Sequence, residues 1–222
     1  MIFVNFKTYK EATGTHAVEL IQKCVDAQKE SGVPIIPVVQ LTDARLCVNT
    51  SGYSVWVQHI DSRDPGKSTG WNTVEAVAET GVNGAFLNHS EHKILNDQLQ
   101  MTNDKCQKVG IETAVFASDL EELKKVIELK PSFAVFEPPE LIASKDSSVA
   151  KAKSGEIKEA AEICGKMGDA SVRLVVGAGV KSREDVEVSL KMGAMGVAVS
   201  SAVVLAQDPY SVLVELAKGF KS

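Results

Sequence analysis

The chain has 222 residues, and its 24 lysines and arginines against 29 aspartates and glutamates give a formal net charge of −5. This acidic balance lacks the basic field with which nucleic-acid-binding proteins displace counterions, so we expect no nucleic-acid partner. No apolar run approaches the roughly 18 residues that span a bilayer, so we expect no membrane partner either. Hydrophobic residues make up 44% of the chain and charged residues 24%, which is typical of a folded globular protein.

The cysteines and the N-terminal segment bear on the compartment. Cys24, Cys47, Cys106 and Cys164 are far apart and form no Cys-x-x-Cys pair. This spacing predicts separate core residues in a reducing compartment rather than a disulfide or a zinc site. In the N-terminal segment, lysines follow a short apolar start, which is the reverse of the order in a signal peptide. We therefore expect a cytoplasmic protein.

Eight short runs of β-branched or aromatic residues recur along the chain, and each ends in polar or small residues. Longer stretches with helical periodicity separate them. The predicted strands cover residues 2–5, 35–39, 54–58, 84–88, 112–116, 133–136, 172–176 and 196–200.

The stretches between the predicted strands have the apolar stripe of amphipathic helices. Apolar residues follow the i, i+3, i+4, i+7 spacing within residues 17–25 and again within residues 157–164. Thr73 and Ser118 precede such stretches and are predicted N-caps, and Glu121 completes a capping box with Ser118.

This alternation of strands and helices favours parallel pairing, with helices covering the sheet. Eight such units in one chain favour a single domain over residues 1–222, folded as a (β/α)8 barrel with eight parallel strands. An open, doubly wound sheet is the alternative, because periodicity alone does not show whether the sheet closes.

In such a barrel the reactive groups lie at the carboxyl ends of the strands. The residues at these predicted ends are Asn5, Lys7, Gln58, His59, His89, Ser90, Glu91, Glu137, residues 177–179, Ser200 and Ser201. A carboxylate can take a proton from carbon beside a carbonyl, while an imidazole, an amide and an ammonium stabilise the resulting enediolate. Small-residue loops after the last two strands suit a phosphate group. This chemistry requires no metal and no organic cofactor.

Four motifs at these strand ends resemble the triosephosphate isomerase family in its shorter, archaeal-type form. They are Asn5-Phe6-Lys7, Asn88-His89-Ser90-Glu91, Phe136-Glu137-Pro138-Pro139-Glu140-Leu141-Ile142 and Val176-Gly177-Ala178-Gly179-Val180. The resemblance covers nearly the whole chain. It implies a TIM barrel that interconverts dihydroxyacetone phosphate and D-glyceraldehyde 3-phosphate in glycolysis and gluconeogenesis, with no cofactor.

The resemblance also implies a role for each catalytic position. Glu137 is the expected proton shuttle, and His89 is the expected neutral group that polarises the carbonyl. Lys7 is expected to stabilise the enediolate and the phosphate, with Asn5 as a positioning donor.

Further matched positions concern support, phosphate binding and assembly. Ser90 is expected to hold Glu137 in its open position, and Glu91 is expected to pair with Lys7. The expected phosphate-binding residues are Ile142, Ala143, Gly177, Gly179, Ser200 and Ser201. Thr69 matches the loop that reaches into a partner subunit's active site, which implies a homo-oligomer, with a dimer favoured and a tetramer as the alternative.

The residues next to Glu137 and His89 predict a stiff lid loop and a neutral imidazole. Pro138-Pro139 stiffens the loop after Glu137, as a closing lid requires. The N-terminus of the following helix is expected to keep His89 neutral.

Two positions depart from the family pattern. Ala143-Ser144-Lys145 stand where many relatives have Gly-Thr-Gly, which is expected to restrict the hinge, and Ala117 replaces a non-catalytic cysteine.

Three other functions stay open on the sequence alone. His59, Asp61, His89 and His92 would give a metal cluster like that of barrel epimerases, such as a phosphopentose epimerase. A Schiff-base aldolase would need a desolvated lysine late in the barrel, but the sixth strand ends in Glu137. A barrel that binds a phosphorylated metabolite without turnover is the third, and only the altered lid supports it.

Overall fold

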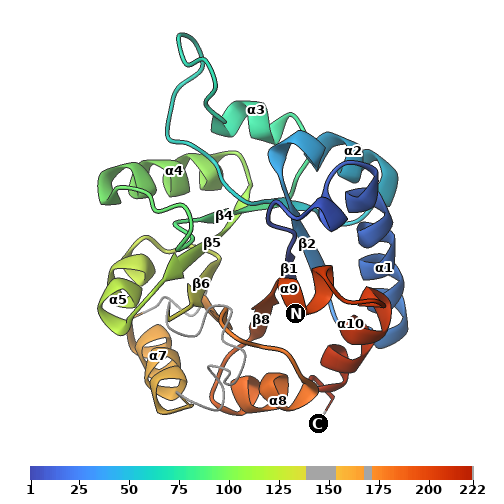
Figure 1. Ribbon diagram of the computed structural model, residues 1–222. Helices are drawn as coiled ribbons and strands as arrows, with labels where there is room; N and C mark the ends of the chain where they lie inside the picture. The colour runs from blue at the N-terminus through green and yellow to red at the C-terminus, as the bar shows by residue number, and fades with distance from the viewer. Residues whose placement is uncertain (139–153, 168–171, 222) are drawn as a thin grey trace.

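Figure 1 shows the computed structural model, which describes residues 1–138, 154–167 and 172–221. Its parallel strands form a closed barrel in chain order, because β1 pairs with both β2 and β8. This closure confirms the predicted (β/α)8 fold and excludes the open, doubly wound sheet. The strands are β1 (Ile2–Asn5), β2 (Ile35–Val39), β3 (Trp56–Val57), β4 (Gly84–Leu87), β5 (Glu112–Ala117), β6 (Phe133–Phe136), β7 (Arg173–Val176) and β8 (Gly196–Val199).

The strands lie where the sequence predicts them, and only some of their ends differ. The largest difference is at β3, which is ladder-paired only at residues 56 and 57 instead of over 54–58. At the end of this strand the Gln58 side chain donates from Nε2 to the carbonyl of Lys7 at 2.9 Å. Gln58, directly after this short strand, thus holds the loop after β1 at the barrel rim by a hydrogen bond.

Helices surround the barrel on its outer side (Figure 1). Within the described ranges, no helix is long and apolar enough to cross a membrane. The helices are η1 (Lys10–Ala12), α1 (Thr15–Ser31), α2 (Leu41–Ser51), α3 (Val74–Ala78), α4 (Asn96–Lys108), α5 (Leu120–Glu128), α7 (Ser154–Met167), α8 (Arg183–Lys191), α9 (Ser201–Val204) and α10 (Pro209–Lys218).

The two predicted helix caps have different outcomes. Thr73 caps α3, since its side chain accepts a hydrogen bond from the backbone N–H of Ala76. The prediction for α5 is wrong, because Asp119 rather than Ser118 caps that helix and accepts from the N–H of Glu122. Both the N–H and the hydroxyl of Ser118 instead donate to the Glu122 carboxylate. The sequence pattern of a helix cap does not show which of two adjacent residues, Ser118 or Asp119, is the capping residue.

Two apolar layers hold the barrel together, one inside the strands and one between the strands and the helices. In the inner layer, the ring of Phe3 lies 5.0 Å from that of Trp56 and 5.2 Å from that of Phe133. Gly84 makes room for the indole, because a Cβ at that position would lie 2.2 Å from a Trp56 ring atom. Aromatic rings therefore fill the barrel interior beneath the carboxyl-end rim.

The cysteines are separate core residues, as the sequence predicts, and the structure places them in the outer layer. Cys24, Cys47, Cys106 and Cys164 are all buried and free. Burial raises the pKa of Cys24 to about 12, so its thiol stays protonated at neutral pH. These residues act as small apolar groups in the packing between barrel and helices.

Candidate active site

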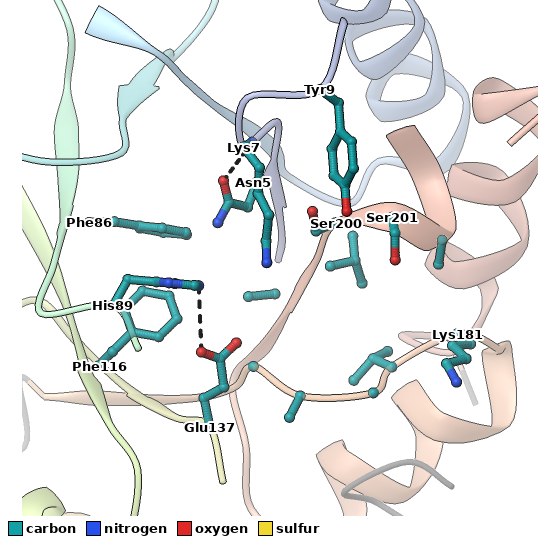
Figure 2. Close-up of a pocket in the computed structure, with 17 residues that line it drawn as sticks. Asn5, Lys7, Tyr9, Phe86, His89, Phe116, Glu137, Lys181, Ser200 and Ser201 are labelled. Atoms are coloured by element: carbon teal, nitrogen blue, oxygen red, sulfur yellow. Dashed lines mark hydrogen bonds and ion pairs between the residues drawn. The ribbon is translucent and has the colours of Figure 1, made fainter. Parts of the chain in front are cut away.

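A cavity of about 90 Å³ opens at the carboxyl-end rim of the barrel (Figure 2). Its lining brings together most of the side chains predicted from the sequence, from both the first and the last strands. The predicted residues in the lining are Asn5, Lys7, His89, Glu137, Gly177, Gly179, Ser200 and Ser201. Tyr9, Phe86 and Phe116 also line the cavity, although sequence reasoning did not single them out.

Lys7 follows β1 in a left-handed backbone conformation, with φ at 46°. Non-glycine residues adopt this conformation only where neighbouring bonds compensate its cost. Here the N–H of Lys7 donates to Asn5 Oδ1 at 2.9 Å, and its carbonyl accepts from Gln58. Its ammonium Nζ lies 2.5 Å from Glu91 Oε1, and the side chain is 20% exposed. The cation therefore enters the cavity with its counter-ion beside it.

His89 is buried at the end of β4 and presents one ring nitrogen to the cavity. The backbone N–H of Glu91 donates to Nδ1 at 3.1 Å, which leaves the proton of a neutral ring on Nε2. Burial lowers the pKa of His89 against the opposing charge of Glu91. The predicted cause was different and is wrong, because the next helix, α4, begins only at Asn96. Burial and a backbone donor favour the neutral imidazole here.

Glu137 follows β6 and faces His89 across the cavity. One carboxylate oxygen, Oε2, lies 3.5 Å from His89 Nε2 and accepts a hydrogen bond from Ser90 Oγ at 3.3 Å. The residue is 7% exposed, and burial raises the pKa of this carboxyl to about 8, although Lys7 opposes the rise. A carboxylate in this position is a stronger base than one in water.

Asn88 positions the loop that carries His89, a role that sequence reasoning missed. Its φ is 61°, a left-handed conformation that asparagine tolerates better than most residues. Its side-chain amide donates to the Phe116 carbonyl at 2.9 Å and to Glu122 Oε1 at 2.8 Å, and accepts from the Ile94 N–H at 3.1 Å. Asn88 belongs to one of the strand-end motifs, but its partners lie too far along the chain for spacing to predict them.

The opposite wall of the cavity is made of small residues after β7 and β8. Gly177 lies against the Glu137 side chain, because a Cβ there would be 2.8 Å from Val135 Cγ1 and 3.3 Å from Glu137 Oε1. Gly179 has φ at +66°, a conformation that favours glycine. The hydroxyl of Ser200 is buried without a hydrogen-bond partner among the described residues. This wall therefore contains glycine backbone that other groups can approach closely, and a buried Ser200 hydroxyl that has no hydrogen-bond partner among the described residues.

Comparison with known proteins adds to this geometry. The family model of triosephosphate isomerase matches residues 1–115 and 107–218. The triosephosphate isomerase of Thermoplasma volcanium is 38% identical over 217 residues, which cover 98% of this chain and 99% of the relative. That of Methanocaldococcus jannaschii is 34% identical over 218 residues, with 98% and 99% covered. The chain belongs to the triosephosphate isomerase family.

The fold of this triosephosphate isomerase family member also agrees with a solved structure. A crystal structure of triosephosphate isomerase from Bartonella henselae superposes with a TM-score of 0.77, covering 100% of this chain and 98% of the other. Only 15% of the residues are identical, so this likeness bears on the fold alone. The resemblance predicted from the strand-end motifs is confirmed by the family match.

Three family positions are not part of the cavity lining that the structure describes. Ile142 and Ala143 fall outside the described residues, as does the rest of the lid segment 143–145. Thr69 is exposed, in the loop that projects from the barrel between β3 and α3 (Figure 1). The structure therefore brings Asn5, Lys7, His89 and Glu137 together at one cavity, whereas Thr69 lies in the exposed loop outside it.

The residues of the alternative metal cluster do not converge on one point. His59 Nε2 lies 2.9 Å from Asp61 Oδ1, and its ring stacks on that of His92 at 3.9 Å between centroids. His89 instead faces Glu137. Within residues 1–138, 154–167 and 172–221, no group of three or more histidine, cysteine or acidic side chains is arranged to hold a metal ion.

Proposed function

We propose that this chain interconverts dihydroxyacetone phosphate and D-glyceraldehyde 3-phosphate by proton transfer through an enediolate. The observation that carries the proposal is the pair of buried residues that face each other in one cavity, with Glu137 Oε2 3.5 Å from His89 Nε2. A base opposite a neutral hydrogen-bond donor is the arrangement that abstraction of a proton beside a carbonyl requires. Triosephosphate isomerase is itself a well-known example of a glutamate base paired with a neutral histidine.

The proposed reaction begins at Glu137. Its carboxylate takes a proton from C1 of dihydroxyacetone phosphate, and the C–H electrons form the C1–C2 double bond as the carbonyl π electrons move to oxygen. His89 Nε2–H donates to that oxygen, and Lys7 and Asn5 stabilise the charge. One proton then moves from O1 to O2 by way of His89 Nε2, and Glu137 returns a proton to C2 while the O1 electrons form the aldehyde C=O bond. Every step proceeds without a metal or an organic cofactor.

The phosphate end of the substrate belongs to the small-residue wall. Gly177, Gly179, Ser200 and Ser201 all line the cavity, and glycine backbone carries no side chain that would block a ligand. Backbone N–H groups that have no partner in the first turn of a helix are suitable donors to phosphate oxygens. Ile142 and Ala143, outside the described residues, are proposed to cover this end as part of the lid.

A coupled assay on each triose phosphate, with chelator present, tests the proposal. We expect the purified chain to isomerise both, and Glu137→Asp to lower kcat on the order of a hundredfold, because the carboxylate retracts by about 1 Å. The conservative change at exposed Glu91, Glu91→Asp, provides a comparison outside the facing pair. Absence of turnover in the wild type, or an unchanged rate in Glu137→Asp, would overturn the assignment.

We further propose that residues 1–222 form one catalytic unit of a cytoplasmic homodimer, with a tetramer as the alternative. The projecting loop supports this proposal because it is held in shape. Lys105 Nζ contacts the Ser62 carbonyl at 2.8 Å and Asp64 at 2.5 Å, and Arg63 lies 4.6 Å from the Trp71 ring centroid. Trp71 is nevertheless 48% exposed, which suits burial against a second copy.

Sedimentation equilibrium tests the assembly. A dimer has twice the chain mass of 23.8 kDa. We expect Thr69→Arg to dissociate it and to lower kcat/KM by at least about tenfold, since a buried unpaired charge disfavours the interface. Lys67→Arg in the same exposed loop is the control. A fully active wild-type monomer would contradict the proposal.

A further inference from the structure

Tyr9 lines the catalytic cavity at a position that none of the strand-end motifs includes. It follows the Lys7 turn and packs, half-buried, against the outer apolar layer. Its carbonyl accepts from Thr13 Oγ1 at 2.8 Å and from the Ala12 N–H at 3.0 Å, which fixes the backbone from which the ring projects. The ring has few rotatable bonds, so a fixed backbone also limits where its hydroxyl can lie.

The hydroxyl of Tyr9 points toward Ser200 and Ser201 (Figure 2). Glu137 and His89 lie at the other side of the same cavity, so Tyr9 is on the side of the small-residue wall. A phenol hydroxyl can donate one hydrogen bond to an anionic oxygen. Tyr9 therefore directs a donor to the end of the cavity opposite the proton-transfer pair.

Ser200 supplies an independent sign that this end receives a polar group. Its Oγ is buried and has no hydrogen-bond partner within the described part of the chain. Buried polar atoms are almost always satisfied, so an orphaned hydroxyl in a cavity wall indicates a ligand or a bound water as partner. Tyr9, Ser200 and the glycine backbone line the same cavity, and a phosphate ester supplies three terminal oxygens that accept hydrogen bonds from such donors.

We propose that Tyr9 donates its hydroxyl hydrogen bond to the substrate phosphate and thereby sets the preference for phosphorylated over unphosphorylated trioses. The inference rests on the proposed function, because it names the group that the same cavity recognises at its far end. It assigns Tyr9 to binding and not to proton transfer.

The test compares wild type with Tyr9→Phe, which removes the hydroxyl and keeps the ring. We expect KM for D-glyceraldehyde 3-phosphate and the inhibition constant of inorganic phosphate to rise about tenfold, as loss of one hydrogen bond to a charged group implies. We expect kcat to change little, and kcat/KM for unphosphorylated D-glyceraldehyde to stay the same.

Tyr53→Phe is the matched control. Tyr53 is also partly buried against the outer layer, but it precedes β3, at the rim opposite the cavity, and is absent from the cavity lining. We expect the Tyr53→Phe variant to keep the wild-type constants for both substrates and for phosphate.

The outcomes separate this inference from the proposed function. An equal fall in kcat/KM for both aldehydes would mean that Tyr9 only packs the site, and unchanged constants would mean that it touches no phosphate; either result overturns the inference. A wild type without isomerase activity would instead overturn the proposed function. Calorimetric titration with inorganic phosphate would then still compare wild type with Tyr9→Phe.

Discussion

At the scale of single residues, the positions of the side chains in the site depend on their contacts with neighbouring residues. Sequence reasoning placed Lys7 beside Glu91 and Glu137 near Ser90, and the structure brings both pairs into contact. It assigned no positioning role to Asn88, because a left-handed φ and a partner on another strand are properties of the folded chain.

Gly177 offers a test of positioning at this scale. A Cβ there would lie 3.2 Å from Glu137 Cβ and 2.8 Å from Val135 Cγ1, so Gly177→Ala should push the carboxylate away from His89. We expect kcat to fall on the order of a hundredfold, because displacement by about 1 Å has that effect. Steady-state kinetics measure it.

Gly165→Ala is the control for the glycine substitution. Gly165 is exposed within α7, and a Cβ there would meet nothing within 4 Å. We expect unchanged kinetics and a small gain in stability, since alanine favours a helix. If Gly177→Ala retains wild-type kcat, contact with the glycine does not position Glu137.

At the scale of elements, one polar network ties the end of β4 to the start of α5. Glu122 accepts hydrogen bonds from Asn88, from Lys93 and from Ser118. Burial alone would raise the pKa of Glu122, but these bonds lower it to about 2. The network anchors the loop that presents His89, and no pattern in the sequence indicated it, because the predicted cap at Ser118 assigned that hydroxyl to the helix.

The lowered pKa of Glu122 predicts how stability changes with pH. The folded state holds the carboxylate more strongly than the unfolded chain, so this stabilisation is present above pH 4.5 and is lost as the pH falls toward 2. We expect Glu122→Gln to lower the free energy of unfolding by about 2 kcal/mol at pH 7, and by less than half of that at pH 3. Urea unfolding at the two pH values measures the difference.

Glu121→Gln, one position earlier on α5, is the control for that prediction. The Glu121 side chain is 79% exposed and pairs with Lys124, so its removal should change stability little at either pH. A Glu122→Gln loss that is the same at pH 7 and pH 3 would show that the charge of Glu122 is not what stabilises this junction.

At the scale of the whole molecule, the closed barrel brings distant strand ends to one rim. Eight strand-and-helix units were predictable from alternating periodicity, since both faces of each strand are buried. Closure was not, because it depends on the pairing of β1 with β8 across almost the full chain length. The packing of aromatic rings in the barrel interior was not predictable either, because the rings of Phe3 and Phe133 come into contact only once the barrel closes.

We propose that the Glu137 carboxylate carries the proton between the two substrate carbons. Isomerisation of dihydroxyacetone phosphate in D₂O, with NMR detection of hydrogen and deuterium at C2 of the product, tests it most directly. We expect wild type to introduce deuterium at C2, because a carboxyl proton exchanges with solvent, and Glu137→Gln to form no product above the uncatalysed rate. Deuterated product formed at the wild-type rate by Glu137→Gln would show that another group transfers the proton.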